Sequence, residues 1–332
     1  MISPFNIEIA GKSVRIEPMY GCIHEYCRGF VTDKEADTIV SISQADIDFE
    51  RKKSESEDIK EGIQIRHFTD EYLETLAVYR KIADKMLEWD TILFHGSVVA
   101  VDGIGYLFTA KSGTGKSTHT ALWRKIFGER AVMVNDDKPL IKVKESGTIV
   151  YGTPWNGKHR LGANMSAPLK AICILERSAE NHIEKIAADS AYNMLVQQVY
   201  RPQDPQKLLK VLQLIDKLSE NTELYKLGCN MDISAAETAF KAMGGYIMKL
   251  KESFVTHKNK DDYMMIDATG EFSGLVHSNA TTAFIVECLK NDTTREEIIA
   301  KMLDKYDAPE SKISQDVDRI IGSLKSIEAI DE

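Results

Sequence analysis

Apolar and polar residues alternate in short segments at the start of the chain and recur with helical spacing further on. Residues 5–50 contain several alternating runs, which predict strands, and residues 10–12 predict a hairpin turn. The charged stretch 50–62 lacks a periodic apolar face and predicts an exposed loop. From 69 to 89, apolar residues recur every three or four positions, which predicts an amphipathic helix. We therefore expect a β-rich layer followed by a long helix.

The middle of the chain combines apolar runs with helical segments. The runs at 92–101 and 105–110 flank a turn at 102–104, which favours an antiparallel pair. A helix is predicted directly after the glycine-rich segment that follows, with Gly128 closing it. Further strands are predicted at 131–140, 141–155 (two short strands), 169–177 and 223–229, and further helices at 187–200, 205–218 and 234–249.

The pattern changes near Leu250. Three short strand-like segments follow, and then three helical segments with apolar stripes at 280–290, 294–306 and 314–323. We therefore predict two domains, 1–250 and 251–332, with the first divided into a β-rich entry region and helix (1–90) and a core (91–250). The expected fold class is α/β with a mixed sheet, plus a small α+β, winged-helix-like C-terminal domain.

The composition is that of a folded protein without a membrane span. Hydrophobic residues make up 43% and charged residues 28%, and no apolar run approaches the roughly 18 residues that a span needs. The net charge of −9 argues against nucleic acid or anionic lipid as a partner. The five cysteines form no CxxC pair. We expect a cytoplasmic protein without a structural zinc site.

A glycine-rich loop carries the strongest chemical signal. Residues 110–118, AKSGTGKST, match the P-loop pattern except that Ala110 replaces the usual first glycine. Backbone N–H groups in such a loop cradle phosphate oxygens, and Lys116 and Ser117 would contact phosphates and Mg²⁺. A chance glycine loop is the alternative, but the predicted strand before it and helix after it match the P-loop context. We expect the nucleotide-binding residues to be Ser112, Gly113, Thr114, Gly115, Lys116, Ser117 and Thr118.

Two adjacent carboxylates follow the next buried strand. Asp136 and Asp137 would lie at the carboxyl end of that strand, where a sheet presents groups to ligands. One can complete the shell of Mg²⁺ and the other can accept a hydroxyl proton, and the sequence leaves that division open. We expect Ser117 and Asp137 to bind the metal. His95 is a further candidate, although a histidine after an apolar run is more often structural.

The segment 152–162, GTPWNGKHRLG, gathers aromatic and basic residues between glycines. It is typical of a phosphate clamp or a substrate lid, and an exposed basic loop is the equal alternative. We expect Lys138, Trp155, Lys158 and Arg160 to contact the substrate.

These motifs together resemble the HPr serine kinase/phosphorylase family and, more distantly, ATP-dependent phosphoenolpyruvate carboxykinase. The resemblance covers residues 95–177, although GTPWNGK stands where the kinase family has a longer glycine-rich loop. It implies an HPr kinase-like P-loop domain that uses ATP and Mg²⁺. It also implies catalytic roles for Lys116, Asp136 and Asp137, with His95 as their neighbour.

The last eighty or so residues resemble the PqqD family of leader-peptide recognition modules. The resemblance implies that a leader peptide adds as a strand beside Val276 and His277, near a helix at 316–324. The rival interpretation is a winged-helix DNA binder. From 263 to 332 there are 14 Asp and Glu against 7 Lys and Arg, which disfavours DNA.

The combined hypothesis is a Mg-ATP-dependent kinase that phosphorylates a serine or threonine of a ribosomally made precursor peptide. A kinase for a small serine-like molecule and a non-catalytic, nucleotide-gated peptide binder are the alternatives. The acceptor residue and the oligomeric state, including a homo-oligomer, stay open.

Overall fold

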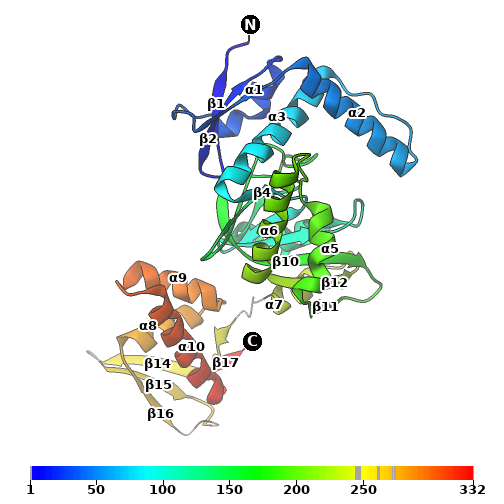
Figure 1. Ribbon diagram of the computed structural model, residues 1–332. Helices are drawn as coiled ribbons and strands as arrows, with labels where there is room; N and C mark the ends of the chain where they lie inside the picture. Colours follow the sequence, from blue (N-terminus) through cyan, green and yellow to red (C-terminus); the bar gives the residue numbers. More distant parts are fainter. Residues whose placement is uncertain (1, 244–247, 260–261, 271, 273, 332) are drawn as a thin grey trace. The chain divides into compact units, whose positions relative to one another are not determined.

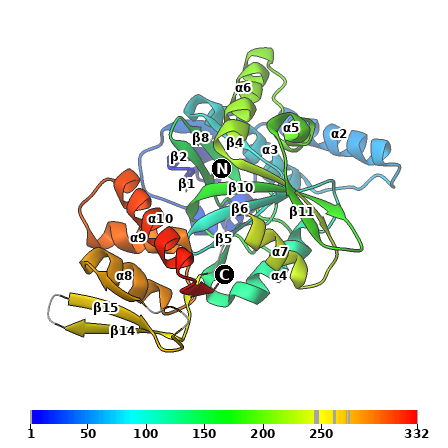
Figure 2. The same ribbon diagram turned by 90° about the horizontal axis from the view of Figure 1, so that it is seen from below.

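The computed structural model describes residues 2–243, 248–259, 262–270, 272 and 274–331. It divides into two compact units, Met1–Ala239 and Phe240–Glu332. Each unit has a hydrophobic core of its own. Figures 1 and 2 show the elements of both from two directions.

Unit 1 begins with a three-stranded layer. Strands β1 (Phe5–Ile9) and β2 (Lys12–Glu17) form an antiparallel hairpin, and β3 (Thr38–Ser41) lies parallel to β2. The predicted turn is confirmed, because Ala10 and Gly11 have φ angles of 50° and 72°, the mirror-image geometry that matches strand twist. Between β2 and β3 lie helix α1 (Cys22–Tyr26) and a short 3₁₀ turn, Arg28–Phe30.

The exposed loop predicted at 50–62 is wrong, because these residues belong to helix α2 (Gln44–Glu61). Ser43 and Asp46 form a capping box at its start, and Gly62 ends it with a φ of 67°. Most of the helix faces solvent, so its polar and charged residues need no apolar stripe. Helix α3 (Asp70–Met86) is confirmed, with Thr69 as its N-cap.

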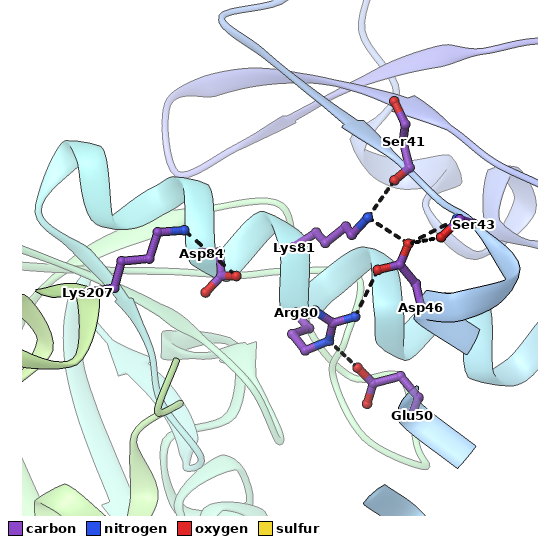
Figure 3. Close-up of polar contacts among 8 residues, drawn as sticks. All are labelled: Ser41, Ser43, Asp46, Glu50, Arg80, Lys81, Asp84 and Lys207. Atoms are coloured by element: carbon purple, nitrogen blue, oxygen red, sulfur yellow. Dashed lines mark hydrogen bonds and ion pairs between the residues drawn. The ribbon is translucent and has the colours of Figure 1, made fainter. Parts of the chain in front are cut away.

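Ion pairs join α2 to α3, as Figure 3 shows. The guanidinium of Arg80 donates to Glu50 at 2.5 Å and to Asp46 at 3.3 Å. Lys81 reaches Asp46 at 2.7 Å and the carbonyl oxygen of Ser41 at 2.9 Å. Arg80 and Glu50 are largely buried, so this network fixes the N-terminal half of α2 on α3.

The central sheet of unit 1 has nine strands among the described residues. Its main path runs β4-β8-β9-β10-β6-β5-β7, and β12 adds to β10 with β11 beyond it. Parallel pairs (β10 with β6 and β12) and antiparallel pairs occur together, so the predicted mixed sheet is confirmed. The strands are β4 (Thr91–Leu93), β5 (Ser97–Val101), β6 (Ile104–Thr109), β7 (Ala131–Asn135), β8 (Leu140–Lys144), β9 (Gly147–Tyr151), β10 (Ser166–Arg177), β11 (His182–Lys185) and β12 (Glu223–Cys229).

Helices cover both faces of this sheet. Leu107 on β6 belongs to a core shared with α5 (Ala188–Gln198) and α6 (Pro205–Asn221). The neighbouring Phe108 points to the other face, where it contacts Trp123 of α4 (Lys116–Phe127). Two 3₁₀ turns, Leu87–Trp89 and Gly128–Arg130, complete the unit's described elements together with helix α7 (Ser234–Ala242), whose last residues belong to unit 2.

Unit 2 contains the three predicted strands and three predicted helices. They are β14 (Phe254–Asn259), β15 (Asp262–Asp267), β16 (Leu275–Ser278), α8 (Ala280–Leu289), α9 (Arg295–Lys305) and α10 (Glu310–Ser326). A small α+β fold is therefore confirmed, and a capping box formed by Thr294 and Glu297 opens α9.

Two boundaries near unit 2 differ from the prediction. The helix predicted to reach 249 ends at Ala242 as described, and residues 244–247 lie outside the described part. Lys249–Leu250 instead forms strand β13, which pairs with β17 (Ile330–Asp331). Among the described helices of the chain, none is long and apolar enough to cross a membrane.

Candidate functional site

The predicted chemical groups meet at one edge of the central sheet. Strands β6 and β7 both pair antiparallel with β5, so they run in the same direction and end at the same edge. The glycine-rich loop follows β6, the Asp136–Asp137 pair follows β7, and His95 precedes β5. Topology thus gathers three motifs that are far apart in the sequence.

A cleft of about 1060 Å³ opens at this edge. Every residue predicted to bind nucleotide, metal or substrate, or to act in catalysis, in the first domain lines it except Thr114. The core contributes His95, Ser112, Gly113, Gly115, Lys116, Ser117, Thr118, Asp136, Asp137, Lys138, Trp155, Gly157, Lys158, His159 and Arg160.

The glycine-rich loop has the backbone geometry that phosphate binding requires. Gly113 and Gly115 have φ angles of 74° and 120°, which side chains other than glycine rarely tolerate. Helix α4 begins at Lys116, directly after the loop, so its positive end faces the cleft. Arg177 at the end of β10 donates to the carbonyl oxygen of Gly113 at 2.6 Å, a contact that the sequence did not reveal.

Asp137 lies among positive groups. Its Oδ1 is 3.4 Å from Nε2 of His95. Burial acts to raise the pKa of Asp137, but the hydrogen bond from His95 and the charges of Lys138 and Lys116 outweigh it, so the pKa lies below its ordinary value. Asp137 is therefore ionised at neutral pH.

Asp136 is more deeply buried and is held by a hydroxyl. Ser97 Oγ donates to Asp136 Oδ1 at 2.5 Å, and Thr120 Oγ1 lies 3.2 Å from Ser97 Oγ. The turn that carries both carboxylates is fixed by Asn135, whose side-chain oxygen accepts from the N–H groups of Asp137 and Lys138 at 2.9 and 2.7 Å. The sequence did not predict this contact of Ser97.

The segment after β9 connects the core to the N-terminal layer. Trp155 is buried, stacks on Tyr79 at 4.0 Å and donates its indole N–H to the carbonyl oxygen of Thr75. Arg160 lies over the ring of Tyr26 at 5.0 Å. Lys158 and Arg160 are exposed at the mouth of the cleft, whereas Trp155 mainly packs α3 against the core.

The opposite wall of the cleft was missed from the sequence. It comes from α1 and α3, and the sequences of these two helices contain no recognisable motif. The residues that form this wall are Cys22, Glu25, Tyr26, Glu71, Tyr72, Thr75 and Leu76. The cleft therefore has a phosphate-binding end and a second end of mixed aromatic and acidic character.

The residues of the cleft fit a nucleotide phosphate chain and Mg²⁺. Burial lowers the pKa of Lys116 although Asp137 and Asp136 act to raise it, so the site favours a further negative group beside the ammonium. Ser117 and the ionised Asp137 would supply the hard oxygen ligands that Mg²⁺ prefers. Within the described residues no three His, Cys, Asp or Glu side chains cluster as metal ligands.

Comparison with known proteins identifies the C-terminal domain. Residues 259–330 match the family described as coenzyme PQQ synthesis protein D (PqqD), so the predicted resemblance is confirmed for this segment. No curated protein of matching sequence was found.

Two solved structures are similar to parts of the chain. TbiB1 in complex with the TbiA(beta) leader peptide is 16% identical and covers 25% of this chain and 94% of its own, with a TM-score of 0.23. The HPr(Ser) kinase/phosphatase from Coxiella burnetii is 12% identical and covers 37% of this chain and 93% of its own, with a TM-score of 0.21. Scores below 0.5 do not by themselves establish a common fold.

Proposed function

We propose that this chain is a kinase that transfers the γ-phosphoryl group of Mg-ATP to a serine or threonine hydroxyl of a precursor peptide. The observation that carries the proposal is the single cleft in which the glycine-rich loop, Lys116 and the two aspartates meet. Bound Mg-ATP would supply the phosphoryl group and a divalent charge beside it.

The residues of the cleft divide into binding and proton-transfer roles. The loop N–H groups and Lys116 bind phosphate oxygens, and Ser117 with Asp137 binds Mg²⁺. The depressed pKa of Asp137 favours a metal ligand over a base. Asp136 is then the base that accepts the hydroxyl proton, and Ser97 holds its carboxylate in place.

The PqqD-family domain supports a peptide as the acceptor. Its sheet has the order β14-β15-β16, so β16 is an edge strand that can accept an added strand. Val276 on β16 is half-buried, and α10 contains the 316–324 segment predicted to lie near the peptide. The side chain of His277 lies outside the described part of the chain.

The test is to incubate the full chain with Mg-ATP and a short precursor-like peptide encoded beside its gene. We expect mass spectrometry to show one added phosphate on a serine or threonine. Asp136→Asn should bind ATP and peptide with unchanged affinity but transfer no phosphate. Intact ATP binding without phosphate on the peptide would contradict the proposal.

A further inference from the structure

The C-terminal part of α2 and the segment that returns from it form a projecting arm, residues 54–68. Figures 1 and 2 show α2 reaching away from the central sheet, with the return segment leading back to α3. The arm contributes nothing to the P-loop chemistry, and the sequence pattern did not predict its helix. Its surface is therefore free for another role.

The arm is held in a defined shape. Asp58 is fully buried and accepts from the backbone N–H of Arg66 at 2.8 Å and from its guanidinium Nε at 3.0 Å. These bonds hold the pKa of Asp58 below its ordinary value. In the first half of α2, Arg51 donates to the carbonyl oxygen of Phe68 at 3.1 Å. The return segment is thus fixed along α2 at both ends.

Apolar side chains are exposed on this ordered arm. Ile59, Ile63 and Ile65 are 65%, 45% and 39% exposed. Ile63 and Ile65 are two residues apart, so in an extended segment they share one side. A group of exposed isoleucines on an otherwise charged arm indicates a surface that another chain covers.

The backbone of the return segment also offers unused hydrogen-bonding groups. The N–H groups of Ile63 and Arg66 bond to Asp58. The N–H groups of Gln64, Ile65 and His67, by contrast, donate to no described residue. In an extended conformation, residues two apart such as Ile65 and His67 turn their N–H and C=O groups to the same side, as at the edge of a sheet. The segment can therefore pair with one added strand.

This edge continues into the cleft. The ring of Phe68 lies 4.9 Å from that of Tyr72, and Tyr72 lines the cleft opposite the glycine-rich loop. A peptide chain that leaves the cleft past Tyr72 would meet Phe68 and then residues 67 to 63. At about 3.3 Å per residue these five positions span roughly 17 Å.

We propose that residues 63–67, together with Ile59, form a docking edge for the part of the substrate peptide that flanks the acceptor hydroxyl. The continuity with the cleft selects this occupant over others. The edge favours an extended stretch rich in apolar or β-branched residues. The inference rests on the proposed kinase function and adds a site for the acceptor segment, separate from leader recognition.

The test compares a double variant with a matched control on the same unit. Ile63→Ser with Ile65→Ser removes the apolar edge. The control, Leu209→Ser, removes a leucine on α6 that is 57% exposed and lies outside the cleft. The acceptor is the core half of the precursor peptide without its leader, so that leader binding does not mask the effect. We expect the double variant to raise the KM for this peptide roughly tenfold, with unchanged kcat and KM for ATP. Leu209→Ser should match the wild type.

Amide exchange gives a second measurement that does not depend on the variants. Residues 64–67 of the wild-type chain should exchange more slowly when the core peptide is bound. The inference is wrong if the wild type phosphorylates the peptide, the double variant has the same KM for it, and bound peptide does not slow the exchange of residues 64–67. The kinase function would then stand. A wild-type dimer that the double variant converts to a monomer would also overturn the inference, because the edge would then bind a second copy. If no peptide is phosphorylated, the kinase function and the inference fail together.

Discussion

Ser97 at the start of β5 and Asp136, which follows β7, form a buried hydrogen bond of 2.5 Å behind the wall of the cleft. A hydrogen bond to a charged group contributes about 1.5–3 kcal/mol, and here it would orient the proposed base. We therefore predict that Ser97→Ala lowers kcat roughly 10- to 100-fold, with KM for ATP unchanged, in a steady-state peptide phosphorylation assay. Thr120→Val, which alters only a neighbour of Ser97, should change kcat less than about threefold. Equal kcat values for Ser97→Ala and wild type would remove Ser97 from the mechanism.

His119 on α4, the helix that follows the glycine-rich loop, is a buried residue whose protonation opposes folding. Its Nε2 accepts from the indole N–H of Trp123 at 3.1 Å, whereas Nδ1 has no hydrogen-bond partner among the described residues. Burial lowers the pKa of His119 from 6.5 to about 4. Because the unfolded chain binds the proton more readily, stability is complete above pH 6.5 and is lost as the pH falls toward 4.

The size of this effect can be measured by urea unfolding at several pH values. We predict that, between pH 7 and pH 4, the free energy of unfolding falls by about 3 kcal/mol more in the wild type than in His119→Gln. All three tryptophans lie in unit 1, so their fluorescence reports that unit. Parallel pH curves for the two proteins would mean that His119 does not titrate in this range.

At the scale of elements, the junction of α2 with α3 depends on Arg80 (Figure 3). The side chain of Glu50 is 5% exposed, so Arg80→Ala would leave a buried carboxylate without its partner. We predict a loss of about 3 kcal/mol in the free energy of unfolding. Lys85→Ala, on the same helix, breaks an exposed pair with Glu88 at 3.9 Å and should cost less than about 1 kcal/mol.

A compensating variant separates lost pairing from lost packing. Arg80→Met with Glu50→Leu removes both charges and should recover most of the stability, because apolar residues of similar size can replace a buried pair. If the double variant is as unstable as Arg80→Ala, the packing of Arg80 rather than the charge of Glu50 explains the loss.

The elements also show which features a sequence can predict. The glycine-rich loop and the Asp136–Asp137 pair were predictable because each is a local pattern next to a buried strand. Helix α2 was not, since its stability comes from caps and from ion pairs with α3 rather than from an apolar stripe. The wall that Tyr26 and Tyr72 add to the cleft was also hidden, because only the tertiary structure brings α1 and α3 opposite the loop.

For the whole molecule, the proposed function assigns peptide binding and chemistry to different units. Unit 1 contains the complete candidate cleft, and unit 2 has its own core and matches the PqqD family over residues 259–330. If unit 2 binds the leader, the acceptor segment is delivered to the cleft at a high effective concentration, without any contribution to the chemical step.

This division predicts the behaviour of a chain shortened to residues 1–243, which keeps α7 intact. Linked sites give effective concentrations of about millimolar, so at micromolar peptide the shortened chain should phosphorylate the full precursor roughly 100- to 1000-fold more slowly. The rate should recover at millimolar peptide, because the cleft itself is unchanged. The leaderless core peptide is the control, and both chains should phosphorylate it at the same rate. A shortened chain that phosphorylates micromolar precursor as fast as the full chain would show that unit 2 does not deliver the substrate.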